Sequence, residues 1–434
     1  MKKCINKIAG LLLITVIIIV CCSYIPVNAI SEGQSNRIAA LKDEYGNIQS
    51  PPIDIVGWLP ESAVSELLTY LRKEMPDRTI QYKYISKTNY SAVVDISLAE
   101  GAGADIVLED YATTYIHAKQ GYLVKQNELA SKYEESGTKA FTYNGDIYAI
   151  PGLCQYAGIY YNKDIFKKYN IVVPKTYNEF LSICLMLKDE GVKPFSMGIY
   201  QWDVVQTHAM AYVVAEYLST DEGAGFGKDY INNKVSLRNK WLPYMKEWAK
   251  LVEDEIITKD MLIEDNDYAV NEFAGGQTAM LCADTLSYRD IITKNPGLNF
   301  AMMPYGGNTT GEQILMGGAM YGFAINANSR NIDVAQKVLE AISTYKGQRA
   351  MWKTQIGSDT YLKGAQFYNP SEFDDIKSVI EADRVYAPWM NWGKASSAYI
   401  DFGMNLQEYI RGEYTLEKAL SNTDLIVRAL IKNN

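Results

Sequence analysis

The spacing of apolar and polar positions predicts alternating strands and helices in the first part of the chain. The apolar residues after Pro60 are spaced as one face of a helix, at Val64, Leu67, Leu68 and Leu71. Short apolar runs are typical of buried strands and occur at 53–56, 80–85 and 104–108, with a second helix expected at 90–98. This strand–helix succession predicts a mostly parallel sheet with helices on its faces.

The pattern continues with a second series of strands and helices. Asn144-Gly145 is a hairpin signal, and Thr176 and Glu179 have the spacing of a helix capping box. Strand–helix alternation restarts at Ile159, which fits a second sheet. Further strands are predicted at 279–282, 300–303 and 321–325, and further helices at 207–218, 240–253, 333–345, 347–355, 404–411 and 415–431.

Composition narrows the classes of function. The 434 residues suffice for two or three domains, and the formal net charge is −9. Because that surface is acidic, it is a poor partner for nucleic acid or anionic lipid. With only two His, a His-rich zinc or copper site is disfavoured, and we expect no cofactor and no metal. The 33 Tyr and seven Trp are numerous enough to supply flat rings for a binding site.

The first 29 residues are typical of an export signal. Lysines at positions 2, 3 and 7 precede an apolar run over 9–22, which is shorter than the roughly 20 residues of a membrane span. Cleavage after Ala29 and lipidation at Cys22 are alternative outcomes, and a retained transmembrane anchor is a third. Residues 30–50 are polar and suit a flexible linker. We therefore expect an exported protein at the extracellular face of the membrane, lipid-anchored or secreted.

Six short segments, taken in order, resemble one protein family. They are 73–77 (KEMPD), 100–107 (EGAGADIV), 143–151 (YNGDIYAIP), 160–166 (YYNKDIF), 174–180 (PKTYNEF) and 273–280 (FAGGQTAM). Their order and spacing resemble the family-1 extracellular solute-binding proteins of ABC importers, the group that includes maltose-binding protein. The resemblance runs from about residue 51 to the C-terminus.

The resemblance implies an α/β fold of two lobes with the periplasmic-binding-protein architecture, each lobe a mostly parallel sheet flanked by helices. The chain would cross between the lobes three times, near 154–157, 317–321 and 366–370. One lobe would comprise 51–155 plus 320–368 and the other 156–319 plus 369–434. A ligand would lie between facing strand ends, and the lobes would close on it. Implied partners are a carbohydrate ligand, the permease subunits of an ABC importer and, through them, an ATPase.

Candidate ligand contacts are aromatic, carboxylate and amide residues near predicted strand ends and crossings, because sugars present apolar faces and a fringe of hydroxyls. They are Trp58, Asp110, Tyr111, Gln155, Tyr156, Trp202, Asp203, Asp284, Gly318, Trp389, Asn391 and Trp392. Asp110 could instead cap the next helix, and Trp58 could pack within its lobe. Leu286 stands where the family often has Trp, so one expected ring is missing.

Other aromatic residues are interpreted as packing. Trp241 and Trp248 lie seven residues apart on an amphipathic helix, and Trp352 also lies on a predicted helix. Tyr82 and Tyr84 are interpreted as strand packing.

The first functional hypothesis is a non-enzymatic, monomeric binding subunit that captures a sugar, expected to be an oligosaccharide, without a nucleic-acid partner. An exported glycan-degrading enzyme using Asp110 with Asp203 or Asp284 is one alternative. A surface adhesin or sensor component that reuses the fold is the other.

Overall fold

The computed structural model describes residues 51–432. Both lobes belong to one compact unit, which takes in Ile53–Met75 and the chain from Ile80 onward. The predicted signal peptide, linker, Ala29 cleavage site and Cys22 lie outside the described residues. Within 51–432, no helix is both long enough and apolar enough to span a bilayer.

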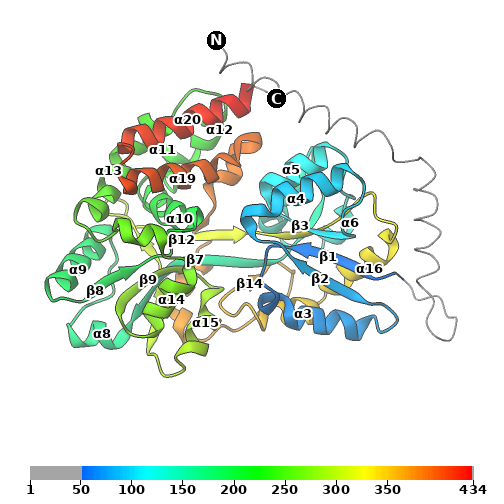
Figure 1. Ribbon diagram of the computed structural model, residues 1–434, viewed down its shortest axis with the longest axis horizontal. Coiled ribbons are helices and arrows are strands. Elements are labelled where there is room, and N and C mark those ends of the chain that lie inside the picture. Colours follow the sequence, from blue (N-terminus) through cyan, green and yellow to red (C-terminus); the bar gives the residue numbers. More distant parts are fainter. Residues whose placement is uncertain (1–50, 433–434) are drawn as a thin grey trace, which may run out of the picture. The chain divides into compact units, whose positions relative to one another are not determined.

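The first lobe is built on the sheet β2-β1-β3-β13-β6. Its strands are β1 (Ile53–Gly57), β2 (Ile80–Tyr84), β3 (Ile106–Glu109), β6 (Ala149–Pro151) and β13 (Gly322–Ile325). All run in one direction except β13, which is antiparallel to both neighbours. Figure 1 shows β1, β2 and β3 of this sheet side by side. The helices are α3 (Glu61–Glu74), α4 (Lys87–Ala99), α5 (Tyr111–Lys119), α6 (Asn127–Ala130), α7 (Glu135–Thr138), α16 (Ile332–Ile342) and α17 (Tyr345–Trp352), with the hairpin β4 (Thr142–Tyr143) and β5 (Asp146–Ile147) and the turn η1 (Lys139–Phe141).

The second lobe is built on the sheet β11-β12-β7-β9-β8, to which β10, β14 and β15 are joined. Its strands are β7 (Leu153–Asn162), β8 (Lys193–Ser196), β9 (Thr278–Asp284), β10 (Phe300–Met303), β11 (Tyr305–Gly306), β12 (Gln313–Ala319), β14 (Asp359–Thr360) and β15 (Val385–Tyr386). All except β7 and β11 run in one direction. Because β7 enters from the first lobe and runs against its neighbours, adjacent pairs are mostly antiparallel, which corrects the expectation of mostly parallel pairing here.

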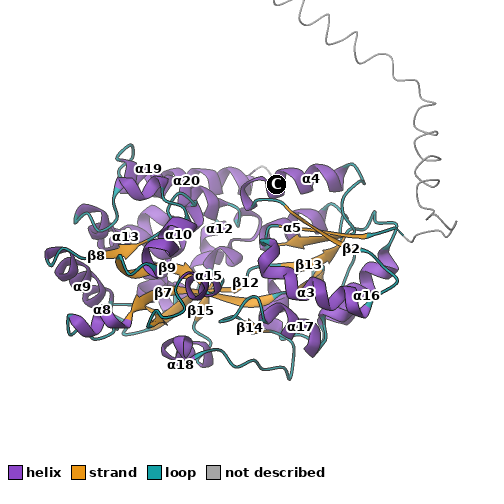
Figure 2. Ribbon diagram, turned by 60° about the horizontal axis from the view of Figure 1, so that its bottom comes forward, coloured by secondary structure: helices purple, strands orange, loops and turns teal. Residues whose placement is uncertain are grey.

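Helices cover both sides of the second sheet (Figure 2). They are α8 (Lys163–Lys168), α9 (Tyr177–Asp189), α10 (Trp202–Val213), α11 (Asp221–Ala224), α12 (Phe226–Ile231), α13 (Leu237–Glu253), α14 (Asn266–Ala274), α15 (Ser287–Lys294), α18 (Asp374–Glu381), α19 (Ala398–Arg411) and α20 (Leu416–Lys432). Shorter helical segments are η2 (Val214–Leu218), η3 (Lys259–Ile263), η4 (Ser371–Phe373) and η5 (Pro388–Ala395). In Figure 2, α19 and α20 lie on the opposite side of the sheet from α18.

Alternate residues of the second sheet pack into two different cores. On β7, Ile159 and Tyr161 belong to the core that contains Trp241 and Trp248, whereas Tyr160 packs with Phe273 on the other side. A strand with both faces buried is apolar along its whole length, which explains the unbroken apolar runs in the sequence. The burial of Trp241 and Trp248 confirms their interpretation as core residues.

Three segments connect the lobes. β6 continues into β7 through Gly152, β12 is followed closely by β13, and β14 pairs with β7 before the chain reaches α18. Along the second crossing, Gly317 has φ +143°, and a Cβ there would lie 2.0 Å from the carbonyl oxygen of Gln155. Only glycine fits where β12 passes β7 this closely. The two-lobed α/β fold with three crossings is confirmed.

Several local predictions are confirmed. The helix after Pro60 spans 61–74, Asn144-Gly145 forms the β4–β5 turn, and Thr176 and Glu179 form a capping box. One boundary differs in a way that affects the site. The helix expected from 207 begins at Trp202, so Trp202 and Asp203 lie in the first turn of α10 rather than in a loop.

Candidate functional site

A cavity of about 310 Å³ lies where the two lobes and the crossing strands meet. The first lobe contributes Trp58 after β1, Tyr84 at the end of β2, and Lys87 at the start of α4. The crossing strands contribute Gln155, Tyr156 and Gly317. The second lobe contributes Gln201, Asp203, Gln206, Thr207, Asn266, Asp284, Leu286, Trp389 and Tyr399. The cavity therefore combines aromatic rings with hydrogen-bonding groups, as small-molecule sites do.

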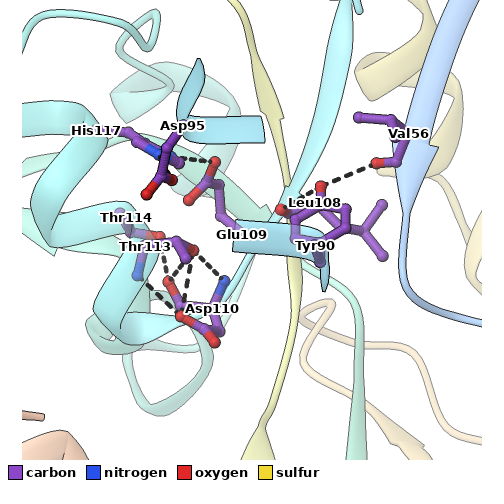
Figure 3. A network of polar contacts seen from close by, with 9 residues as sticks. All are labelled: Val56, Tyr90, Asp95, Leu108, Glu109, Asp110, Thr113, Thr114 and His117. Carbon is purple, nitrogen blue, oxygen red and sulfur yellow. Dashed lines mark hydrogen bonds and ion pairs between the residues drawn. The ribbon is translucent and has the colours of Figure 1, made fainter. Parts of the chain in front are cut away.

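The two indoles of the cavity are held by other rings. Trp58 meets Tyr90 edge to face, with 4.7 Å between ring centroids. The Tyr90 hydroxyl donates to the carbonyl oxygens of Val56 and Leu108, so that supporting ring is itself fixed between β1 and β3 (Figure 3). Trp389 stacks on Tyr399 at 5.2 Å. Both indoles are thus positioned before any ligand arrives, which lowers the entropy lost on binding.

Charged groups of both signs lie in the cavity. Lys87 of the first lobe places its Nζ 3.7 Å from Oδ2 of Asp203 in the second lobe, and 5.8 Å from the centroid of the Trp202 ring. Asp284 accepts a hydrogen bond from the Leu286 N–H at 3.0 Å. Burial, and secondarily the neighbouring Asp203 charge, raises the pKa of Asp284 to about 6. The cavity therefore holds a carboxylate that titrates near neutral pH.

At the end of β3, also in the first lobe, the Glu109 carboxylate binds a neighbouring side chain of the same lobe, His117 (Figure 3). His117 Nδ1 lies 2.8 Å from Oε1 of Glu109, and its Nε2 lies 2.8 Å from Oδ1 of Asp95. Burial opposes a charge on this ring, but hydrogen bonds to Asp95 and Glu109 outweigh it and raise the pKa of His117 to about 10. Both ring nitrogens therefore carry protons at neutral pH.

Asp110 caps α5 instead of lining the cavity. Its Oδ1 accepts from the Thr113 N–H at 2.9 Å, and its own N–H donates to the Thr113 hydroxyl at 3.0 Å. This reciprocal pair is a capping box, so the capping interpretation is correct. Neither Asp110 nor the following Tyr111 lines the cavity.

The cavity brings together half of the predicted contacts, namely Trp58, Gln155, Tyr156, Asp203, Asp284 and Trp389. It does not include Trp202, whose ring packs edge to face against Tyr399, nor Gly318, although Gly317 lines it. Asn391 is exposed and lies against Gly227.

The expectation for Trp392 is wrong. Its side chain is 0% exposed and packs against the rings of Tyr230 and Trp241 in the core of the second lobe. The segment η5 lies over α12, so an indole that the sequence places in a connection is covered by the helical layer.

Sequence reasoning missed several residues of the cavity. Tyr84 and Lys87 lie at or just after the end of β2, so the strand-end argument that selected Trp58 would also have selected them. Tyr84 is 51% exposed, and its interpretation as strand packing is wrong. No sequence signal marks Asn266 or Tyr399, which only the packing of α14 and α19 brings to the cavity. Within the described part of the chain, no group of three His, Cys, Asp or Glu side chains could hold a metal ion.

Residues 57–349 match the model of a family described as bacterial extracellular solute-binding protein. The multiple sugar-binding protein of Streptococcus mutans is 20% identical over 281 residues, 61% of this chain and 62% of that protein. The melibiose/raffinose/stachyose-binding protein MelE of Bacillus subtilis is 23% identical over 258 residues, 57% of this chain and 60% of that protein. The chain thus spans less than two thirds of the length of these curated relatives.

The fold is also shared with solved structures. A sugar transporter protein from Bacillus licheniformis, solved in complex with stachyose, superposes with a TM-score of 0.74 at 16% identity. The match covers 88% of this chain and 100% of that one. At this identity the likeness shows the fold alone.

Proposed function

Because the chain belongs to the family of bacterial extracellular solute-binding proteins, we propose that it captures an oligosaccharide between its lobes and delivers it to the permease of an ABC importer. The observation that carries this proposal is the cavity at the crossing strands. Its rings suit the apolar faces of sugars, and its carboxylates and amides suit their hydroxyls. The names of the sugar-binding relatives support a carbohydrate ligand.

Closure of the lobes is the proposed mechanism. The bodies that move are 51–155 plus 320–368 and 156–319 plus 369–434, linked by the three crossings. A ligand that contacts Trp58 on one lobe and Trp389 on the other binds the closed state more tightly and so shifts the population toward it. The permease and its ATPase would then respond to the closed state.

The proposed contacts are the predicted residues that meet in the cavity, together with Gln201 and Asn266. We propose no contact for Asp110, Tyr111 or Trp392. The cavity's one lysine is balanced by Asp203 and Asp284, which supports a neutral sugar over a phosphorylated one.

The family assignment favours a binding protein over a glycan-degrading enzyme. The carboxylate pairs considered for hydrolysis involve Asp110, and that side chain is engaged in the α5 capping box. We propose two alternatives for its location: the protein is attached to the membrane by a lipid on Cys22, or it is released after cleavage at Ala29. We propose a monomer.

Intrinsic tryptophan fluorescence tests the proposal, since Trp58 and Trp389 line the cavity. Titration with melibiose, raffinose and stachyose should give a saturable shift with a Kd of about 1 μM, corresponding to about −8 kcal/mol. Chromatography of the incubated sugar should show no product. Trp389→Ala should weaken binding, whereas Trp352→Ala, in the first lobe outside the cavity, should not. Hydrolysis of the sugar, or absence of binding across neutral oligosaccharides, would refute the proposal.

A further inference from the structure

We propose that the mouth of the cavity is an additional sugar subsite, where Tyr84 stacks on an oligosaccharide ring that lies beyond the enclosed part of the cavity. This inference rests on the proposed function and concerns the length of the oligosaccharide. The ligand would have at least one sugar ring more than fits in the inner part of the cavity.

The exposure of the lining residues distinguishes an inner end from a mouth. Tyr156 is 3% exposed and Trp389 is 5% exposed. By contrast, Tyr84 is 51% exposed, and the side chains of Lys87 and Asp203 are 40% and 37% exposed. We define the mouth as Tyr84, Lys87 and Asp203.

Tyr84 pairs with Gly57 of β1 through its backbone, and its side chain contributes less to the packing of the lobe than that of Tyr82. Its strand neighbour Tyr82 donates its hydroxyl hydrogen to the carbonyl oxygen of Leu59 at 2.7 Å and packs against the first core. Residues two apart on a strand share a face, yet within residues 51–432 the side chain of Tyr84, at the strand end, makes neither a hydrogen bond nor a ring contact and is half exposed. Because Tyr84 lines the cavity, its half-exposed ring offers a flat apolar face to a ligand there.

The mouth stays open although the lobes already approach each other there. Lys87 and Asp203 come from different lobes, and their charged atoms are 3.7 Å apart. Both side chains nevertheless remain more than a third exposed, so the approach of the lobes does not seal the cavity. A chain longer than the enclosed part can therefore extend outward past Tyr84.

Size and charge define the ligand class. The whole cavity, mouth included, has a volume of about 310 Å³, which lies at the small end of ligand sites of roughly 300–1,000 Å³. A neutral pyranose ring suits the mouth, because Tyr84 offers a flat apolar face while Lys87 and Asp203 can donate to and accept from hydroxyls. Since both charge signs are present, neither an anionic nor a cationic ring is favoured.

The test is calorimetric titration with neutral oligosaccharides of two, three and four rings, from the melibiose, raffinose and stachyose series and from malto- and cello-oligosaccharides. Tyr84→Ala should weaken binding of the longest ligand that binds by about five- to tenfold and leave the two-ring ligand unchanged. Tyr84→Phe keeps the ring and should retain full affinity. Tyr345→Ala, a 48% exposed tyrosine of the same lobe outside the cavity, is the matched control.

The outcomes separate this inference from the proposed function. If the wild type binds and Tyr84→Ala affects all lengths equally or none of them, the mouth subsite is refuted and the proposed function stands. If the wild type binds no member of any series, both are refuted. Loss of long-ligand affinity in Tyr345→Ala as well would also overturn the subsite.

Discussion

In the first lobe, β3 ends at Glu109 and is followed by Asp110, and both carboxylates bind partners within the lobe. In the second lobe, β9 ends at Asp284, which lines the cavity. Glu109 is fully buried beside His117, and Asp110 caps α5. Asp284 accepts from backbone N–H groups at the start of α15, and within residues 51–432 no cation lies as close to it as His117 lies to Glu109. Two similar strand ends therefore differ in what surrounds them.

The difference shows that an acidic residue after a strand is a candidate ligand contact only if its carboxylate is not already bound by a neighbouring side chain or helix N-terminus. α5 carries both partners of the β3 carboxylates, His117 and Thr113, on its own turns. α15 supplies only backbone groups to Asp284. Substitutions at these strand ends, or at the residues that bind their carboxylates, should therefore affect either the stability of the protein or its affinity for sugar.

His117→Ala should have the largest effect on stability. It leaves Glu109 buried without its partner, and breaking a buried ion pair typically lowers the free energy of unfolding by about 3–5 kcal/mol. Urea unfolding followed by fluorescence measures the loss. Sugar affinity of the folded variant should be unchanged, since His117 does not line the cavity.

Two controls sharpen this prediction. Asp95→Asn removes only the half-exposed partner and should lower the unfolding free energy by less than about 1 kcal/mol. The folded pKa of His117, about 10, lies above the unfolded value of about 6.5. The stabilisation from the charged His117 is therefore fully present at pH 6.5 and is lost as pH rises through 10. A difference between wild type and His117→Ala that does not shrink over this range would contradict the ion-pair account. Burial raises the pKa of Glu109, so at acid pH protonation of Glu109 also removes the ion pair.

Asp284→Asn should have the largest effect on binding. Hydrogen bonds to a charged group contribute about 1.5–3 kcal/mol, so sugar affinity at pH 7.5 should fall by about ten- to a hundredfold. Because the pKa of Asp284 is about 6, wild-type affinity should also fall as pH drops below 6. The variant should show a flat profile in calorimetric titrations from pH 5 to 8, and a persisting slope would assign the pH dependence elsewhere.

The same substitution should stabilise the free protein. The folded pKa of Asp284 exceeds the unfolded value of about 3.9, so its ionised form opposes folding. That cost is absent below pH 4 and complete above pH 6. The variant should match the wild type at pH 4 and exceed it by about 1–2 kcal/mol at pH 7.5, the partial exposure of the side chain reducing the effect. Thermal unfolding at both pH values checks this.

Asp110→Ala should have the smallest effect. Loss of an N-cap lowers the free energy of unfolding by about 1 kcal/mol. Because the side chain faces α5 and not the cavity, affinity for sugar should stay within twofold of the wild type. A larger loss of affinity would show that the ends of β3 and β9 act alike.

Much of the fold could be predicted from the sequence because its cues are local. The helix at 61–74 follows from apolar spacing, the α9 start from Thr176 and Glu179, and the hairpin from Asn144-Gly145. Strand partners were harder to predict, because apolar runs buried on both faces contain no information on direction. The antiparallel course of β7 depends on its entry from the other lobe.

Half of the candidate contacts could be predicted because strand ends and crossings are visible in the sequence. The other contacts could not be predicted, because the exposure of a side chain depends on which residues from elsewhere in the chain pack against it. Trp389 and Trp392 lie three residues apart in η5, yet one lines the cavity and the other is buried against Trp241. Tyr82 and Tyr84 show the same contrast on β2.

The sequence by itself determined the two-lobed α/β fold, the core role of Trp241 and Trp248, and the supply of rings and carboxylates near strand ends, because local spacing and ordered motifs encode these. Only the tertiary structure decided which of those groups meet. Long-range packing hides Trp392, places His117 beside Glu109, and leaves Asp284, Trp389 and Tyr84 facing one cavity. Residues distant in the chain determine the burial and the protonation of each side chain, and a local sequence pattern does not show which distant residues these are.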